Sequence, residues 1–218
     1  MTRLIKDISP NFTVIEKDET MKTGLEEMLQ GNGKIIMDDV LRASIGSAFF
    51  EDGKGLQRLF IVGNLPYYIT SPILRKFFCT EYPDILGGLF MIQAEVGEKI
   101  ARDAKKKSYL YRLLNYAYHV KYLKTVSAKA FAPPPKVKSC LVSLVKKAEL
   151  PQISFERLLR FLEVFAPYSR KTLGKIAKMQ EKREGKNTFF IPKHLAGKRL
   201  EALRREELEE ILATPNPV

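Results

Sequence analysis

The sequence contains few of the residues that build disulfide frameworks or metal sites. Among its 218 residues are two cysteines, Cys79 and Cys140, two histidines and no tryptophan. This scarcity excludes a disulfide scaffold and argues against structural zinc, so we expect no metal ligands. No apolar run approaches the ~20 residues of a membrane helix, and the first residues lack the long apolar stretch of a signal peptide. We therefore expect a soluble protein of a reducing compartment, the cytoplasm, without a membrane partner.

Positive charge is in excess. The chain has 37 Lys+Arg against 25 Asp+Glu, a formal net charge of +12, and its 45% hydrophobic content is that of a globular protein. A basic surface releases counterions when it meets a phosphate backbone, which favours RNA or DNA as the partner. A solvated, lysine-rich surface is the alternative reading of the charge alone. The basic residues cluster at Lys105–Lys107, at Lys136 and Lys138, at Lys146–Lys147, and from Arg170 to Lys186.

Two domains are predicted from a change in periodicity near residue 148. Residues 1–147 alternate short apolar runs with helical stretches, a pattern typical of an α/β sheet with parallel strands. The predicted strands are 12–15, 34–37, 58–62, 88–92, 117–123 and 139–145, and helices are predicted at 73–78 and 94–104. Residues 148–218 are predicted to form a small basic helical domain. The residues predicted to share one helical face there are Phe155, Leu158, Leu159, Leu162 and Phe165, and 200–212 carries Glu/Arg pairs at helical spacing.

Polar residues stand at the ends of three predicted strands. Glu16, Asp39 and Asn64 each follow an apolar run. Parallel sheets bind ligands beyond the carboxyl ends of their strands, which makes these three residues candidates for one site. Each acid taken singly also fits a solvated strand end or a helix cap.

The segment Asn64-Leu65-Pro66-Tyr67 predicts a specific chemistry. An aromatic amine such as adenine N6 is a poor nucleophile, because its lone pair is delocalised into the ring. The Asn64 side-chain oxygen and the Leu65 carbonyl could accept both N–H groups and favour a pyramidal nitrogen, while Pro66 fixes φ and adds no donor. Tyr67 could stack on the base. A turn that ends a strand is the alternative reading of this tetrapeptide.

Several segments, in order along the chain, resemble the ribosomal RNA adenine dimethyltransferase family. Residues 64–74, NLPYYITSPIL, are similar to its catalytic motif. Further similar segments are 14–18 (VIEKD), 39–41 (DVL), 93–96 (QAEV), 131–139 (FAPPPKVKS) and 169–173 (SRKTL). The similarity is greatest to the small-subunit rRNA enzymes, and the erythromycin-resistance methyltransferases are relatives. The resemblance implies an α/β fold with a Rossmann-like class I methyltransferase sheet and a small C-terminal helical domain.

The resemblance also implies a cofactor and roles for individual residues. S-adenosylmethionine would be the methyl donor, with Glu16 on its ribose hydroxyls, Asp39 on its adenine amine and Asn64 beside it. The residues implied to act on the target adenine are Asn64, Leu65, Pro66, Tyr67 and Phe131, of which Tyr67 and Phe131 would stack on the flipped base. Plain core packing is the alternative for Phe131. Phosphate contacts are expected from Lys136, Lys138, Arg170 and Lys171.

The implied reaction is N6,N6-dimethylation of two adjacent adenosines in the 3′-terminal hairpin of small-subunit rRNA. The implied partner is this rRNA in a precursor of the small ribosomal subunit, and we expect the enzyme to be a monomer. Two alternatives stay open: methylation of large-subunit rRNA, as in the erythromycin-resistance enzymes, and a short form that binds RNA during ribosome assembly without methylating it.

The chain departs from the family at its beginning. The family carries a first strand and a glycine-rich loop that approaches the cofactor, yet no glycine precedes Gly24 here. In dinucleotide-binding folds the acid of the second strand follows that loop by ~20 residues, a distance that runs past Met1 when counted back from Glu16. We therefore expect the first strand and the loop to be missing from residues 1–147. Either Met1 is internal to a longer protein, or the chain is the binding-only short form.

Overall fold

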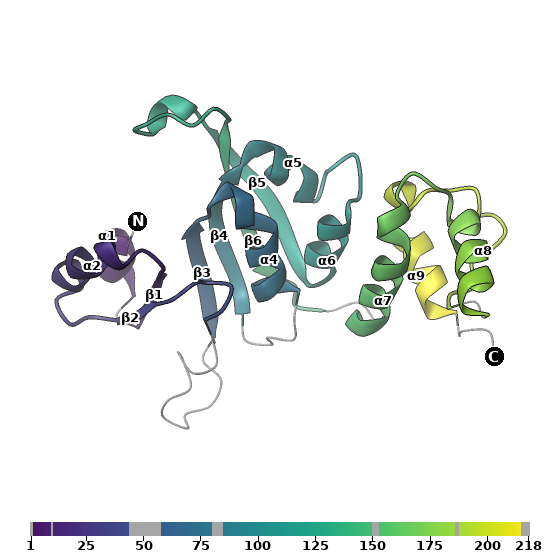
Figure 1. Ribbon diagram of the computed structural model, residues 1–218, viewed down its shortest axis with the longest axis horizontal. Helices are drawn as coiled ribbons and strands as arrows, with labels where there is room; N and C mark the ends of the chain where they lie inside the picture. The colour runs from purple at the N-terminus through teal and green to yellow at the C-terminus, as the bar shows by residue number, and fades with distance from the viewer. Residues whose placement is uncertain are drawn as a thin grey trace, which may run out of the picture. The chain divides into compact units, whose positions relative to one another are not determined.

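The computed structural model describes residues 2–9, 11–43, 58–79, 85–149, 153–185 and 188–214. The chain forms two compact units, Met1–Arg58 and Leu59–Val218, whose elements are labelled in Figure 1. No helix in these described ranges combines the length and the apolar character that a bilayer crossing requires.

The first unit is a small α/β body. Its described residues form α1 (Thr2–Ile8), β1 (Thr13–Glu16), the 3₁₀ helix η1 (Glu19–Met21), α2 (Lys22–Leu29) and β2 (Lys34–Met37). The two strands pair in parallel, with Val14 opposite Ile35. Helix α2 buries Leu25 and Leu29 and ends at Gln30, which has a left-handed backbone. This confirms both predicted strands.

The second unit contains a four-stranded mixed sheet. Its strands follow the order β3 (Leu59–Asn64), β4 (Ile85–Gln93), β6 (Ser139–Lys146) and β5 (Tyr118–Val126). The pair β3–β4 is parallel, but β4–β6 and β5–β6 are antiparallel. The alternation of strands and helices predicted parallel strands, and for β6 this was wrong, because β6 runs opposite to β3, β4 and β5. The connection from β5 to β6, residues 127–138, contains only the three-residue 3₁₀ helix η3 (Ala128–Ala130). A parallel crossover usually contains an α-helix.

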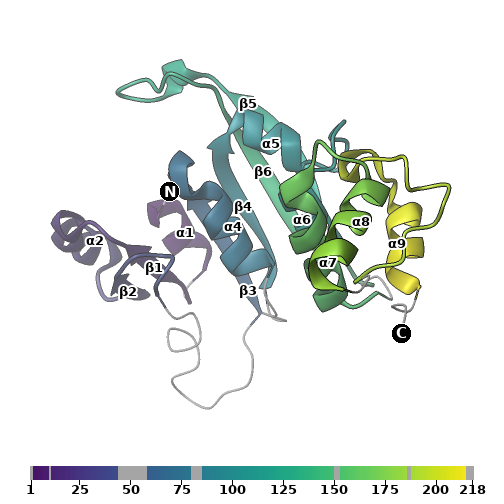
Figure 2. The same cartoon turned by 45° about the vertical axis from the view of Figure 1, so that its right-hand side comes forward.

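Strand β4 forms the centre of this unit. It is the most buried strand, and Phe90 and Ile92 have no exposed surface. Helix α4 (Thr70–Phe78) packs its apolar face beside it, and Phe78 makes edge-to-face ring contacts with Phe90 and Tyr118 at 5.5 and 5.0 Å. Helices α5 (Ala94–Ile100) and α6 (Tyr109–Ala117) complete the α/β part (Figure 2).

The C-terminal residues are helical, as predicted. The elements are α7 (Phe155–Phe165), η4 (Ala166–Tyr168), α8 (Leu173–Glu184), η5 (Leu200–Ala202) and α9 (Arg205–Ala213). Leu158, Leu162 and Phe165 of α7 are buried, which confirms this part of the predicted apolar face, whereas Phe155 and Leu159 are half-buried. The single helix predicted over 200–212 is wrong, because Leu203 adopts an extended backbone between η5 and α9.

The break before α9 follows from a capping box. The Glu207 carboxylate accepts the Arg204 backbone N–H at 3.0 Å, so a new helix begins beyond Arg204. The same carboxylate accepts from Lys198 Nζ at 2.6 Å and from Arg204 Nη2 at 2.9 Å. The Lys198 hydrogen bond, followed by the Arg204 backbone N–H, lowers the pKa of Glu207 to about 2.

The α/β part and the C-terminal helices contact each other within Leu59–Val218. Arg112 of α6 donates to the carbonyls of Leu200 and Leu203, at 2.6 and 2.9 Å. The Tyr116 hydroxyl donates to the Ile153 carbonyl at 2.5 Å. The division into domains 1–147 and 148–218 stays a prediction.

Glu207→Gln should lower the thermal stability at about pH 7, because it removes a charge held by two cations. The folded-state pKa is depressed, so the stabilisation is present above the ordinary value of 4.5 and is lost as the pH falls toward about 2. The difference in Tm from the parent should therefore shrink between about pH 5 and about pH 3. The matched control is Glu206→Gln, on the exposed side of the same turn. A Tm difference that is independent of pH would contradict the assigned role.

Candidate functional site

The turn after β3 presents the residues of the predicted catalytic segment. Asn64 ends the strand opposite Met91 of β4, and the Leu65 N–H donates to the Met91 carbonyl at 3.0 Å. Pro66 adopts a φ of −58°, which its ring requires, and begins η2 (Tyr67–Ile69). The buried Thr70 hydroxyl donates to the Pro66 carbonyl at 3.0 Å. Backbone pairing and this hydroxyl therefore fix the turn.

Two acceptors at this turn have no protein partner among the described residues. The Asn64 residue is exposed, and Leu65 has its N–H but not its carbonyl in a hydrogen bond. Within the described ranges, no hydrogen bond engages the Asn64 side-chain oxygen or the Leu65 carbonyl. Unengaged acceptors on a fixed backbone can receive the two N–H groups of an amine without first breaking protein contacts.

A second segment reaches the same end of β4 from the other side. Ser139 begins β6 opposite Gln93, two residues beyond Met91, and Lys138 accepts the Ala94 N–H at 2.9 Å. The Tyr67 hydroxyl lies 2.5 Å from the hydroxyl of the fully buried Ser139. The structure thereby brings together the two sequence segments 64–74 and 131–139.

Phe131 lies in the β5–β6 arm, which we define as residues 127–138. The arm projects beyond the strands in both ribbon views, and contains the 3₁₀ helix η3 (Ala128–Ala130), capped by Ser127 (Figure 1). Phe131 follows η3 and is half-buried. Because the arm joins Val126 to Ser139, it extends from the same end of the sheet as Asn64. The predicted role of Phe131 stays a prediction.

Glu16 and Asp39 lie together in the first unit, at the carboxyl ends of β1 and β2. Glu16 Oε1 accepts the N–H groups of Lys17 and Asp18, at 2.8 and 3.0 Å. Asp39 Oδ1 accepts the Leu41 N–H at 2.9 Å, and Oδ2 pairs with Lys17 Nζ at 3.0 Å. The Leu41 hydrogen bond and then the Lys17 ammonium hold the pKa of Asp39 below its ordinary value, so this carboxylate is ionised at neutral pH. That the two acids share a site with Asn64 stays a prediction.

The predicted phosphate-binding residues are all exposed. Lys136 and Lys138 belong to the β5–β6 arm, and Arg170 and Lys171 lie in the turn before α8. A charge pattern that the motifs do not reveal surrounds the arm: between Asp103 and Glu149 the sequence has ten Lys, one Arg and no Asp or Glu. Such a stretch has no acidic side chains to neutralise its lysines locally, which strengthens its field toward a polyanion.

The described ranges contain no group of three or more His, Cys, Asp or Glu side chains that could hold a metal ion. Both cysteines are buried, and burial raises the pKa of Cys79 to about 12 and that of Cys140 to about 11.

A family model described as "Ribosomal RNA adenine dimethylase" matches residues 1–212. The chain belongs to this family. Two relatives are both named "Ribosomal RNA small subunit methyltransferase A". The protein of Aster yellows witches'-broom phytoplasma is 31% identical over 175 residues, 79% of this chain and 65% of that protein. The protein of Chlorobium chlorochromatii is 34% identical over 216 residues, 98% of this chain and 78% of that protein.

Solved structures have the same fold. A dimethyladenosine transferase from Plasmodium falciparum superposes with a TM-score of 0.74 at 19% identity, covering 97% of this chain and 84% of that one. The 23S rRNA methyltransferase ErmE gives a TM-score of 0.67 at 24% identity, covering 98% and 86%. These similarities confirm the predicted α/β methyltransferase fold. The chain spans about two thirds of the phytoplasma relative's length.

Sequence reasoning missed the contact between Tyr67 and Ser139. Both residues stand in segments that resemble the family, but 72 positions separate them and only the pairing of β4 with β3 and β6 joins them. The absence of acids between Asp103 and Glu149, in contrast, could have been found by counting.

Proposed function

We propose that this chain dimethylates N6 of two adjacent adenosines in the 3′-terminal hairpin of small-subunit rRNA, with S-adenosylmethionine as methyl donor. The observation that carries the proposal is the pair of unengaged acceptors at Asn64 and Leu65 on a turn fixed to β4. Family membership and relatives named for the small subunit support the substrate. The expected partner is a precursor of the small ribosomal subunit, in the cytoplasm, bound by a monomer.

The residues of the first unit fit the adenosine part of the methyl donor. Glu16 Oε1 accepts two backbone N–H groups, which fixes the orientation of the carboxylate. The other oxygen, Oε2, is suited to accept from ribose hydroxyls. Asp39 is an anionic acceptor for an adenine amine, with Lys17 as a competing partner. When bound, the donor supplies a methyl group activated by a sulfonium.

The second unit supplies the groups for the target base. Asn64 and Leu65 would each accept one N–H of the adenine amine, which localises the lone pair on N6 for attack. Taking the adenine out of its stack costs a few kcal/mol, and stacking on Tyr67 and Phe131 would offset part of that cost. No general base is required, because the proton leaves the methylated nitrogen afterwards.

The test of this function is transfer of a radiolabelled methyl group to undermethylated small ribosomal subunits. We expect label in N6-methylated adenine. Complete absence of label, together with retained RNA binding, would overturn the enzymatic proposal for residues 1–218 and favour the binding-only alternative. Label in isolated large-subunit rRNA but not in small subunits would instead overturn the substrate assignment.

Asn64→Ala should lower methyl transfer by at least about 100-fold, because it removes an acceptor for the reacting amine. RNA affinity, measured by filter binding, should stay close to that of the parent. Asn32→Ala, in an exposed turn of the first unit, is the matched control and should retain full activity. Parent-like transfer by Asn64→Ala would show that the assigned role is wrong.

Ser139→Ala should lower kcat by about fivefold with little change in KM, since one hydrogen bond that orients Tyr67 is worth about 1 kcal/mol. Tyr67→Phe removes the same hydrogen bond from the other side and keeps the ring. In steady-state methylation assays the double variant should therefore be no slower than either single variant. Additive losses would mean that the two hydroxyls act independently.

Charge reversal at Arg170 and Lys171 should weaken RNA binding and flatten its salt dependence. Loss of two phosphate contacts should reduce the slope of log K against log [salt] by about 1.5. Reversal of the exposed Arg3 and Lys22 changes the net charge equally and serves as the control. Identical slopes in the parent and the Arg170/Lys171 variant would show that these residues do not contact RNA phosphates.

A further inference from the structure

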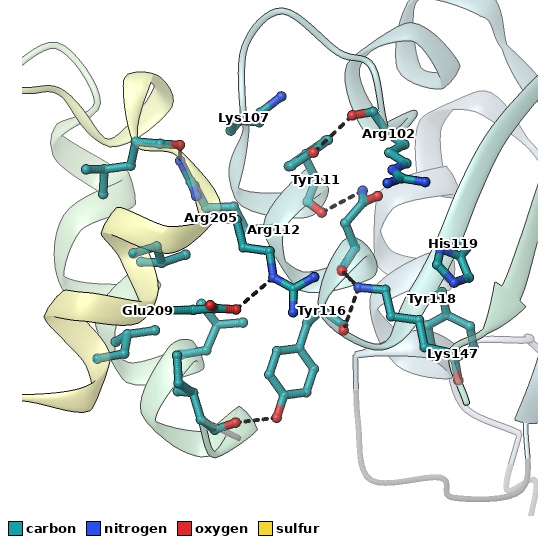
Figure 3. A pocket seen from close by; sticks show the side chains of 16 residues that line it. Arg102, Lys107, Tyr111, Arg112, Tyr116, Tyr118, His119, Lys147, Arg205 and Glu209 are labelled. Carbon is teal, nitrogen blue, oxygen red and sulfur yellow. Dashed lines mark hydrogen bonds and ion pairs between the residues drawn. The ribbon is translucent and has the colours of Figure 1, made fainter. Parts of the chain in front are cut away.

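A pocket lies within Leu59–Val218, between α6 and β5 on one side and α7 and α9 on the other (Figure 3). Its volume is about 280 Å³. It is lined by the first residues of β5, Tyr118 and His119, whereas the Tyr67–Ser139 contact is beside the last residue of β5, Val126. Eight residues of strand separate these ends, roughly 26 Å. The pocket is therefore distinct from the proposed methylation site.

Positive charge dominates the pocket. The cationic or titratable nitrogens come from Arg102, Lys107, Arg112, His119, Lys147 and Arg205. Among the described residues that line the pocket, Glu209 carries the one carboxylate, and it is already paired with Arg205 at 2.7 Å. An anion would therefore meet a net positive wall.

Arg112 has a hydrogen-bond donor without an acceptor. Its side chain is 94% buried, since 6% of its surface is exposed, and Nη2 donates to two carbonyls of the C-terminal residues. Nε is buried, and no acceptor for it occurs in the described part of the chain. A buried donor left unpaired is unfavourable, so an acceptor supplied by a ligand would be favoured there.

Lys147 places a second desolvated cation at the pocket. Its Nζ donates to the carbonyls of Asn115 and Tyr116, at 2.5 and 3.1 Å, which leaves one of three N–H bonds for a ligand. Burial lowers the pKa of Lys147 from its ordinary value, and nearby Arg205 and Arg102 lower it further. Burial lowers the pKa of Arg112 to about 10, so the guanidinium stays charged at neutral pH.

Aromatic rings and leucines form the rest of the wall. The hydroxyls of Tyr111, Tyr116 and Tyr118 each donate to a backbone carbonyl. They are thus occupied, and what these residues offer to a ligand is ring surface. Leu158 and Leu212 add apolar area from α7 and α9. A ligand that satisfies this wall needs an anionic group and a planar ring.

We propose that the pocket binds a nucleoside monophosphate unit, with its phosphate toward Arg102, Arg112 and Lys147 and its base against the tyrosine rings. The volume lies just below the ~300–1,000 Å³ typical of small-molecule sites, which suits one nucleotide and excludes a dinucleotide. The unit is either a free nucleotide or one unpaired residue of an RNA chain. This inference does not depend on the proposed methyl transfer.

Isothermal titration of residues 1–218 with uridine 5′-monophosphate tests the proposal. A pyrimidine is used because the proposed cofactor residues would take an adenine. We expect 1:1 binding, with uridine and inorganic phosphate each roughly tenfold weaker or more, because each lacks one half of the recognition. If inorganic phosphate binds as tightly as the nucleotide, the proposed contact between the base and the tyrosine rings is wrong. If the nucleotide does not bind, the whole proposal is wrong.

Surface variants locate the binding without disturbing the fold. Arg102→Gln should weaken uridine monophosphate roughly tenfold, whereas Glu209→Gln should tighten it by removing the acid. Lys178→Gln, on an exposed position of α8 outside the pocket, is the matched control. Equal affinities of the Arg102 and Lys178 variants would show that the nucleotide binds elsewhere.

A tetrauridylate distinguishes the two sources of the nucleotide. If it binds at least as tightly as the monophosphate and is equally sensitive to Arg102→Gln, the ligand is an RNA residue. If only the monophosphate binds, the ligand is a free nucleotide. Either result supports the proposal. It is refuted if Arg102→Gln leaves the affinity for the tetrauridylate unchanged and the monophosphate does not bind.

Discussion

The pairing of β4 with strands of opposite direction on its two edges determines where the functional residues of Leu59–Val218 lie. The parallel partner β3 ends at Asn64 and the antiparallel partner β6 begins at Ser139, so a strand end and a strand start meet at one end of β4. Close backbone approach permits this arrangement: a Cβ on Gly87 would overlap the Leu144 carbonyl oxygen. The contact between Tyr67 and Ser139 then follows from backbone register.

Local patterns in the sequence predicted the described strands, because short apolar runs bounded by Gly, Asn and Pro specify strands by themselves. Two ends differ by three residues, since β4 begins at Ile85 and β5 ends at Val126. The turn after Asn64 could be recognised for the same reason, because its conformation depends on neighbouring residues. The reversed direction of β6 could not be recognised, because it is decided by which edge of β4 is free. The break at Leu203 was also hidden, since a buried leucine continues a helical pattern as well as it ends one.

The residues of the candidate site likewise fall into those that the sequence alone identifies and those that it does not. The residues of each strand end were identified from sequence, and the structure places Glu16 and Asp39 at neighbouring strand ends in one unit and Asn64 at a strand end in the other. Residues that act through contacts across the fold were not identified. Arg112 is an example: in sequence it is one basic residue of a helix, and its burial arises from carbonyls about ninety positions later.

The two cysteines have a practical consequence. A thiol reacts with alkylating agents as the thiolate, and pKa values of about 12 and about 11 leave almost no thiolate at neutral pH. Cys79 and Cys140 are also shielded by burial. A cysteine introduced on the exposed β5–β6 arm would therefore be labelled selectively by a maleimide dye in the otherwise unaltered chain. Fluorescence from that one position would report when the arm meets RNA.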